Sequence, residues 1–275
     1  MHSKERVLGA LIGFAIGDAM GATTEFMSAE EIAKEYGQVT EIIGGGWLNL
    51  KPGQVTDDTQ MTLCVYRAMR ASEDCPKRTL RELCEQFRAW ADSNPPDIGG
   101  ACYRAIYGTK SLSPSEWIYH NQKRQQQSGK RDLGNGGLMR CLVPCLADDL
   151  KLCIDQSYLT HSDPIHEWYI SIYYQVLHES LKGKKLHFSP LKKEPSGYVL
   201  NTLDNCGYWF LYSDSFENAI IGAVNNGGDA DTIAALTGAL AGAFYGVEAI
   251  PERWINVLDP EVLRELNECA DWLTK

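Results

Sequence analysis

The sequence has no apolar run long enough to span a bilayer, and residues 1–6 lead into a glycine-interrupted helical stretch instead of a secretory signal. Its nine cysteines lack the Cys-x-x-Cys or Cys/His spacing of a zinc site, and their odd number does not suit a closed disulfide framework. We therefore expect no membrane span, reduced thiols and a cytoplasmic location.

Positive charge is also scarce, because 26 Lys and Arg residues stand against 36 Asp and Glu residues, for a formal net charge of −10. This balance argues against a nucleic-acid backbone as the main partner. Polar–apolar alternation with a period of two, the mark of half-buried strands, does not extend over a useful length, and there is no obvious linker. We expect one all-α domain over residues 1–275.

Small residues recur at every fourth position of the helix predicted over 5–21, at Gly9, Gly13, Gly17 and Gly21. A complementary row lies in the apolar helix predicted after residue 232, at Ala234, Gly238, Gly242 and Gly246. An interior Gly costs a helix about 1 kcal/mol relative to Ala, so such rows suggest that two backbones approach closely. We predict that these helices pack together, which would bring the chain ends together and place Asp18 and Glu25 near residues 229–231. Ordinary core packing without functional consequence is the alternative.

Two motifs place paired carboxylates and hydroxyls at the start of a predicted buried helix: Thr56-Asp57-Asp58-Thr59 and Asp229-Ala230-Asp231-Thr232. One Asp is enough to cap a helix, so capping does not explain two such crowded sites. Four carboxylates brought together would repel one another unless cations were present. Oxygen ligands without His or Cys favour Mg²⁺ or Mn²⁺ over zinc. The sequence therefore predicts two divalent metal ions, Mg²⁺ or Mn²⁺, at a site built from both motifs.

Other segments leave their role open. The loop Gly134–Gly137 offers backbone N–H groups to an anion, or is a simple helix-entry turn. The glycine loop that carries Trp47 either lies over a site or only turns a corner. His161, Glu25 and Asp97 are each ligand candidates or ordinary structural and surface residues. The polar, Gln-rich stretch 121–131 is predicted to be an exposed loop.

Four segments carry longer motifs in a fixed order: 13–26 (GFAIGDAMGATTEF), 44–61 (GGGWLNLKPGQVTDDTQM), 134–140 (GNGGLMR) and 224–246 (VNNGGDADTIAALTGALAGAFYG). Together they resemble the ADP-ribosylglycohydrolase family, and within it the branch that reactivates dinitrogenase reductase. The resemblance runs from about residue 6 to residue 260. It implies an all-α fold with a central binuclear metal site.

The resemblance also implies roles for individual residues. The metal ligands would be Thr56, Asp57, Asp58, Asp229, Asp231 and Thr232. Glu25 matches a flap glutamate that serves as general acid or base, and Asp97 matches an acid that handles the ribose of arginine-linked substrates. The substrate contacts would be Gly134, Asn135, Gly136, His161, Tyr212 and Gly228.

The activity that the resemblance implies is hydrolysis of the N-glycosidic bond between ADP-ribose and an arginine side chain of a modified protein. The partners would be that ADP-ribosylated protein and the product ADP-ribose, and a regulatory protein partner is left open. Alternatives are the same chemistry on ADP-ribosylserine, O-acetyl-ADP-ribose or a toxin-modified target. The non-enzymatic alternative is a structural role like that of certain lens crystallins. The intact acids of both motifs argue against it.

Overall fold

The computed structural model describes residues 3–186 and 189–275, and every regular element within these ranges is a helix. Only two isolated β-bridges occur there, Gly45–Leu50 and Gly134–Tyr198. The helices are α1 (Lys4–Gly21), α2 (Ala29–Tyr36), α3 (Asp57–Ala71), η1 (Pro76–Arg78), α4 (Thr79–Asp92), α5 (Gly100–Ile106), α6 (Pro114–Ser128), α7 (Gly136–Met139), α8 (Leu142–Leu146), α9 (Leu150–Tyr158), α10 (Ile165–Leu181), α11 (Val199–Tyr212), α12 (Phe216–Val224), α13 (Ala230–Tyr245), η2 (Val247–Ala249), α14 (Glu252–Ile255) and α15 (Pro260–Leu273). The all-α prediction is confirmed.

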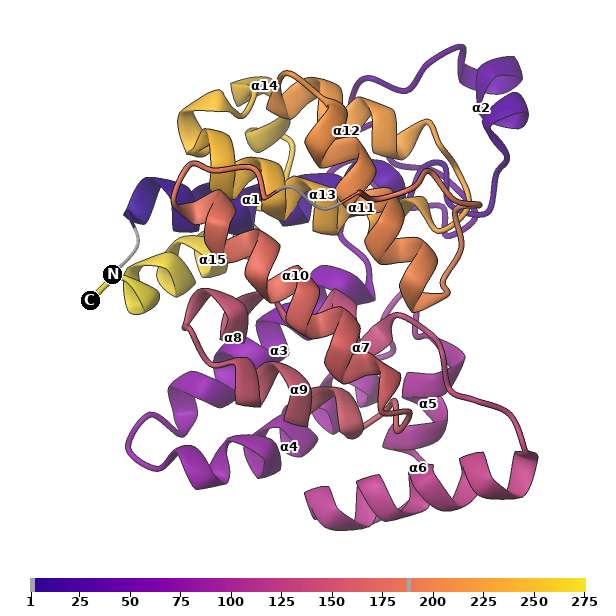
Figure 1. Ribbon diagram of the computed structural model, residues 1–275, viewed down its shortest axis with the longest axis vertical. Helices are drawn as coiled ribbons and strands as arrows, with labels where there is room; N and C mark the ends of the chain where they lie inside the picture. Colours follow the sequence, from indigo (N-terminus) through magenta and orange to yellow (C-terminus); the bar gives the residue numbers. More distant parts are fainter. Residues whose placement is uncertain (1–2, 187–188) are drawn as a thin grey trace.

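Helices α1 and α13 lie side by side at the centre of the fold (Figure 1), and both are buried along most of their length. A Cβ atom added at Gly17 would lie 2.0 Å from the carbonyl oxygen of Ala234, and one added at Gly13 would lie 2.3 Å from that of Gly238. No side chain fits between backbones this close, so the glycine row is required by the packing. The predicted packing of the two small-residue rows is confirmed.

The second row differs from the prediction at its ends. Gly246 lies just past the last residue of α13 with a φ of 85°, a left-handed conformation that suits glycine, and it ends the helix. It still faces α1 as predicted, because its carbonyl carbon would lie 2.9 Å from a Cβ at Gly9. At the other end the row extends to Ala230, whose carbonyl oxygen would lie 2.5 Å from a Cβ at Gly21. The chain ends meet as predicted, with Lys4 of α1 paired to Asp271 of α15.

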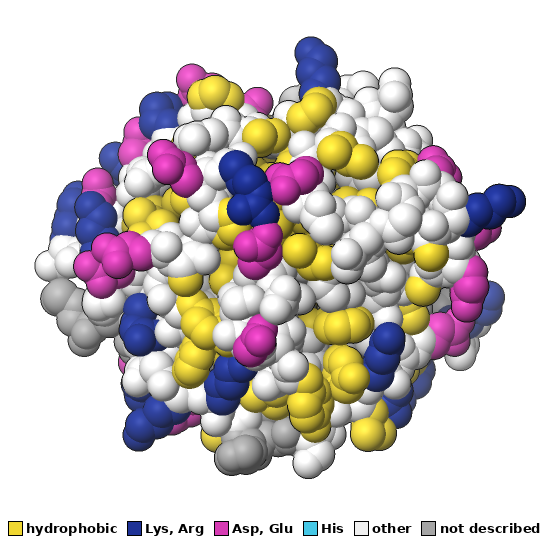
Figure 2. All heavy atoms as spheres, turned by 90° about the horizontal axis from the view of Figure 1, so that it is seen from above, with side chains coloured by type: hydrophobic (Ala, Val, Ile, Leu, Met, Phe, Trp, Pro, Cys, Tyr) yellow, Lys and Arg dark blue, Asp and Glu magenta, His cyan; other side chains and the backbone are white. Residues whose placement is uncertain are grey.

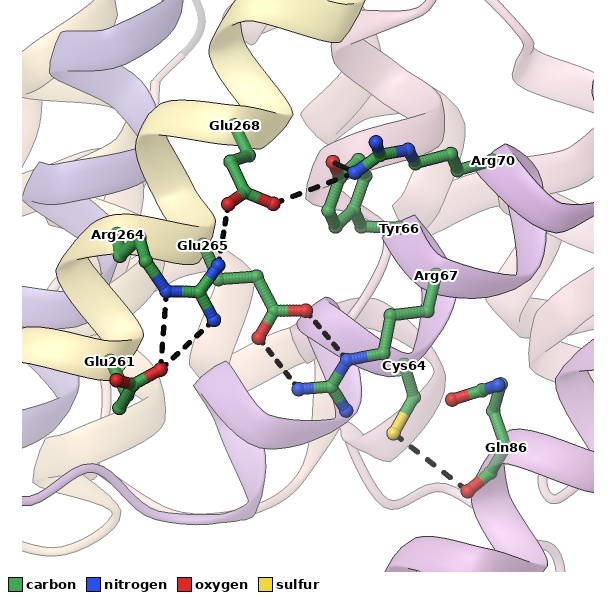
Figure 3. A network of polar contacts seen from close by, with 9 residues as sticks. All are labelled: Cys64, Tyr66, Arg67, Arg70, Gln86, Glu261, Arg264, Glu265 and Glu268. Carbon is green, nitrogen blue, oxygen red and sulfur yellow. Dashed lines mark hydrogen bonds and ion pairs between the residues drawn. The ribbon is translucent and has the colours of Figure 1, made fainter.

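Helix α3 is fixed at its exposed side by α15. Arg67 donates two hydrogen bonds to Glu265, from Nε and from Nη2, each 2.6 Å long (Figure 3). Arg70 of α3 and Arg264 of α15 both bond to Glu268 in the same network (Figure 3). A bidentate arginine–carboxylate pair has a defined geometry, so it helps to fix the position of α3 relative to α15.

The stretch 121–131 is not a loop as predicted, because α6 continues to Ser128. Gln, Lys and Arg are good helix formers, and a helix can be polar on nearly all sides when it lies at the surface. Helix α6 lies at one end of the molecule (Figure 1), and the amide of Asn121 donates to the carbonyl oxygen of Leu159 at 2.6 Å. The polar composition of residues 121–128 correctly indicated an exposed segment, but an exposed segment can be a helix as well as a loop.

Figure 2 shows acidic, basic and hydrophobic side chains interspersed on the face seen from above, so negative charge forms no single patch on that face. Among the described residues, no helix has the length and apolarity needed to cross a membrane.

Candidate active site

A cavity of about 340 Å³ lies where the C-terminal end of α1 and the N-terminal ends of α3, α5, α7 and α13 meet. Its lining includes most of the predicted site residues: Glu25, Asp57, Asp58, Asp97, Gly134, Asn135, Gly136, His161, Asp229, Asp231 and Thr232. No Lys or Arg is among the described residues that line it. A larger hollow of about 980 Å³ lies between α3, α4 and α15, but it contains none of the predicted site residues. The smaller cavity is therefore the candidate active site.

The N-terminus of α3 does not use Asp57 or Asp58 as its cap. Thr56 is the N-cap residue, and its hydroxyl accepts from the backbone N–H of Asp58 at 3.4 Å. The buried carboxylate of Asp18 accepts from the backbone N–H of Thr56 at 3.0 Å and of Thr59 at 3.0 Å. Asp18 and Thr56 together accept from the N–H groups of Thr56, Asp58 and Thr59, so this work does not fall to the side chains of Asp57 and Asp58, which line the cavity. Asp57 Oδ2 accepts from the backbone N–H of Gly99 at 3.2 Å.

Asp58 links the two acid motifs. Its Oδ2 accepts a hydrogen bond from the hydroxyl of Thr232 at 3.1 Å, which joins the start of α3 to the start of α13. Its Oδ1 is buried and has no hydrogen-bond partner among the described residues. A buried carboxylate oxygen without a donor is unfavourable unless a cation or a proton occupies its lone pairs. This oxygen fits a metal ligand.

At the start of α13, Asp231 Oδ1 accepts from the backbone N–H of Thr232 at 2.8 Å, but capping does not explain Asp229. Asp229 is the N-cap residue, and its side chain accepts no capping hydrogen bond from the helix. Its Oδ2 instead accepts from the amide of Asn135 at 2.6 Å. Asp229, Asp231 and Glu25 each present a carboxylate oxygen, and these oxygens lie within 4.8 Å of one another. Three hard oxygen donors at this spacing suit a divalent cation such as Mg²⁺ or Mn²⁺.

Burial and mutual repulsion make these acids unusually basic. Burial raises the pKa of Glu25 to about 8, with the charge of Asp229 adding to the shift and the hydrogen bond from Trp47 opposing it. Burial raises the pKa of Asp57 to about 7, and burial raises that of Asp229 to about 6. Burial, with further carboxylates nearby, holds the pKa of Asp231 well above its ordinary value. The chain alone does not neutralise this cluster, so bound protons or cations must.

The glycine loop and His161 form the wall beside Asp229. A Cβ at Gly136 would lie 2.6 Å from Cε1 of His161, and one at Gly134 would lie 3.1 Å from its Nε2, so the glycines make room for the ring. His161 bonds through Nδ1 to the Thr160 hydroxyl at 2.8 Å. Burial holds the pKa of His161 well below its usual range, so the imidazole is neutral and adds no positive charge.

Three predicted residues do not line the cavity. Tyr212 ends α11 with 67% of its side chain exposed and its ring against Tyr208. Thr56 lies beneath the cavity as the cap of α3. Gly228 has a φ of 66° and is bonded through its backbone to the segment after Glu25. The N–H of Phe26 donates to Gly228 O at 2.7 Å, and the N–H of Gly228 donates to Met27 O at 2.8 Å. Gly228 thus supports the segment that presents Glu25.

Sequence reasoning gave no role to two buried residues that hold the site. Asp18 was expected nearby but not as the anchor of α3, although a single acid within the apolar, glycine-rich stretch 7–21 is a signal of a buried contact. Arg140 is fully buried and donates to the carbonyl oxygen of Gly136 at 2.6 Å and to Gln156 Oε1 at 2.7 Å. It fixes the glycine loop from behind. No periodicity marks such a residue in advance.

Comparisons with known proteins agree with this geometry. The family model described as ADP-ribosylglycohydrolase matches residues 1–193 and 184–275. The chain is similar to ADP-ribosyl-[dinitrogen reductase] glycohydrolase of Rhodospirillum rubrum, at 37% identity over 294 aligned residues, covering 98% of this chain and 95% of that protein. It is 29% identical to ADP-ribosylarginine hydrolase Tri1 of Serratia proteamaculans (strain 568), covering 94% of this chain and 76% of that protein.

Among solved structures, the chain is similar to one described as an ADP-ribosylglycohydrolase-related protein complex. The TM-score is 0.75 and the sequence identity 28%, covering 98% of this chain and 97% of the other. The family model covers nearly the whole chain, and the predicted acid motifs meet at one cavity in the corresponding fold. This chain belongs to the ADP-ribosylglycohydrolase family.

Proposed function

We propose that the chain is a divalent-metal-dependent hydrolase that removes ADP-ribose from arginine side chains of modified proteins. The observation that carries this proposal is the buried cluster of carboxylates at a cavity without Lys or Arg. The names of two relatives, one an ADP-ribosylarginine hydrolase and one acting on ADP-ribosylated dinitrogen reductase, support arginine as the acceptor and dinitrogen reductase as a candidate target. The free state of all nine cysteines supports a reducing compartment such as the cytoplasm.

Two divalent ions, Mg²⁺ or Mn²⁺, fit the donor set. Five of the six predicted ligands line the cavity and would hold them, namely Asp57 and Asp58 from one motif and Asp229, Asp231 and Thr232 from the other. Thr56 instead caps α3 and is not proposed as a ligand. The unpartnered Oδ1 of Asp58 and the converging oxygens of Asp229 and Asp231 support this assignment. Bound ions would supply positive charge that orients and polarises the hydroxyl groups of the distal ribose.

The residues of the chain supply the remaining chemistry. Breaking an N-glycosidic bond passes through an oxocarbenium-like state, which nearby carboxylates stabilise. Glu25 lies at the cavity beside Asp229 and Asp231, where its carboxyl group can pass a proton to the leaving nitrogen. Water then adds to C1 of the ribose and gives up a proton to a carboxylate, which completes the hydrolysis. Asp97 also lines the cavity, where a carboxylate can orient the ribose. Gly134, Asn135, Gly136 and His161 line the wall that would receive the rest of ADP-ribose.

The main alternatives share the site but differ in the acceptor, namely serine, O-acetyl-ADP-ribose or a toxin-modified target. A crystallin-like structural role is a different class. That role has no use for the four buried carboxylates at the cavity, Glu25, Asp57, Asp58 and Asp231, whose burial is unfavourable. The cluster therefore favours an enzyme.

The test is release of ADP-ribose from an arginine-modified protein, after chelator treatment and again after addition of Mn²⁺ or Mg²⁺. We expect release only with metal, and faster release from arginine-linked than from serine-linked substrate or O-acetyl-ADP-ribose. Faster cleavage of the serine-linked substrate or of O-acetyl-ADP-ribose would mean that this compound, and not ADP-ribosylarginine, is the substrate. Neither metal binding nor release at millimolar metal would favour the structural class.

A further inference from the structure

Phe26 and Trp47 form an exposed pair of rings at the mouth of the cavity, which we call the aromatic pair. Their side chains are 67% and 54% exposed, yet both line the cavity. Their ring centroids are 5.3 Å apart at an interplanar angle of 49°. They are the only phenyl or indole rings among the described residues that line it. Large aromatic side chains left in water beside a polar site are typical of a binding surface.

The backbone that presents Phe26 is held in an unfavourable conformation. Phe26 has a φ of 64°, in the left-handed region that non-glycine residues with bulky side chains rarely adopt. Its N–H donates to Gly228 O at 2.7 Å. Strain of this kind persists where surrounding contacts enforce it, and it is concentrated at binding and active sites.

Trp47 is fixed just as firmly. A Cβ at the preceding Gly46 would lie 2.2 Å from the carbonyl oxygen of Ala22, so the loop lies directly on the end of α1. The Thr23 hydroxyl donates to Gly44 O at 3.0 Å, and Gly45 pairs with Leu50 to close the loop. The indole N–H donates to Glu25 Oε2 at 2.6 Å. The two rings are thus held in place before any ligand binds, which lowers the entropy lost on binding.

The hydrogen bond from Trp47 places the aromatic pair on one side of the reacting bond. Glu25, its partner, is the residue proposed to act at the bond between ribose and acceptor. The adenine of the substrate is separated from that bond by two sugars and a diphosphate. A ring one hydrogen bond away from Glu25 therefore lies beside the acceptor and not beside the adenine.

We infer that the aromatic pair binds the guanidinium group of the ADP-ribosylated arginine, an inference that rests on the proposed function. A guanidinium is planar and stacks on aromatic faces, and it keeps its positive charge in water. Asp97 also lines the cavity and is not among the proposed metal ligands, so its carboxylate can add negative charge that favours a cation. A serine-linked substrate has neither the plane nor the charge. The aromatic pair would therefore select arginine over serine.

The experiment compares Phe26→Leu and Phe26→Tyr with the wild-type metal-loaded enzyme on arginine-linked and serine-linked peptides. Leu keeps an apolar side chain on the same strained backbone but removes the ring, whereas Tyr retains the ring. We expect Phe26→Leu to raise KM for the arginine-linked peptide about tenfold, with kcat changed less than about twofold. We expect Phe26→Tyr to restore KM, and product inhibition by ADP-ribose to be the same in all three proteins.

Trp168→Leu is the matched control, since Trp168 is 59% exposed on α10 and does not line the cavity. It should leave both substrates unaffected. The inference would be overturned if Phe26→Leu left KM for the arginine-linked peptide unchanged, or raised KM for the serine-linked peptide by the same factor. Weaker product inhibition by ADP-ribose in Phe26→Leu would also overturn it, because the ring would then contact the nucleotide and not the acceptor. Failure of the proposed function is recognised separately, because the wild-type enzyme would then not cleave the arginine-linked peptide.

Discussion

Buried carboxylates of this protein differ in what satisfies them. Asp18 accepts three hydrogen bonds from the first turn of α3, from the N–H groups of Thr56 and Thr59. Asp58 has one oxygen bonded to Thr232 and one oxygen with no partner among the described residues. A carboxylate of the first kind stabilises the fold, whereas one of the second kind requires a ligand.

Asp231→Asn tests the ligand role at a single residue. The amide keeps the shape of the side chain but removes the charge, so we expect metal binding and turnover to fall together, by about a hundredfold or more. Removing one buried charge from a repelling cluster should also raise the melting temperature of the metal-free protein by a few degrees. Calorimetric titration with Mn²⁺ and thermal unfolding measure the two effects. A variant with wild-type turnover would contradict the assignment.

Phe26→Gly tests the strain of the aromatic pair. Glycine adopts a φ of 64° without penalty, so removal of the side chain should stabilise the protein by about 1 kcal/mol and raise its melting temperature by about 3 °C. Turnover of arginine-linked substrate should fall in the same variant. A lower melting temperature would mean that Phe26 stabilises the fold instead of straining it.

The sequence predicted which acids form the cluster, because two carboxylates in each motif exceed what capping needs. It did not predict what supports them. The anchoring role of Asp18 and the bonds from Arg140 to the glycine loop join residues far apart in the chain. Neither contact leaves a periodic pattern, so only the folded structure reveals it.

Helices α1 and α13 position the acids of the site, because Asp18 of α1 anchors the start of α3 and the start of α13 carries Asp229 and Asp231. In Gly17→Ala the new Cβ would lie 2.0 Å from the backbone carbonyl oxygen of Ala234. The backbone of a packed helix cannot move aside as the end of a flexible side chain can. We expect a loss of about 3 kcal/mol, or about 10 °C in melting temperature, together with weaker metal binding. Gly100→Ala is the control, since its nearest neighbour is the flexible end of Arg104 at 3.1 Å. Equal stability of the two variants would argue against the close packing.

Elements with a strong periodic pattern were predictable and those without one were not. The rows of small residues predicted the pairing of α1 with α13, because a four-residue period places them on one face. The end of α13 was misjudged, since a glycine that ends a helix has the same spacing as one inside it. The second half of α6, from Asn121 to Ser128, was predicted to be a loop because its exposed polar surface resembles that of a loop.

For the whole molecule, the acid cluster links stability to pH and to metal. In the metal-free protein Glu25, Asp57 and Asp229 have pKa values of about 8, 7 and 6, against ordinary values of 4.5, 3.8 and 3.8. The native state therefore binds more protons than the unfolded chain between about pH 4 and pH 8, and the free energy of unfolding falls as the pH rises through that range. Divalent ions bind the deprotonated carboxylates and should oppose this loss.

Thermal unfolding at pH 5 and pH 8, with chelator and with millimolar Mg²⁺, measures this linkage. We expect the metal-free protein to melt at a lower temperature at pH 8, and added metal to raise the melting temperature more at pH 8 than at pH 5. An equal rise at both pH values would mean that the metal does not bind to the raised-pKa acids.

The central claim is that the acids of α3 and α13 hold divalent ions at the cavity. Crystals of the wild-type protein grown with millimolar Mn²⁺, examined by anomalous scattering at the manganese edge, test it most directly. The account predicts two peaks within bonding distance of Asp57, Asp58, Asp229 and Asp231, and their loss in Asp231→Asn. Crystals that show no peak at these carboxylates would contradict it.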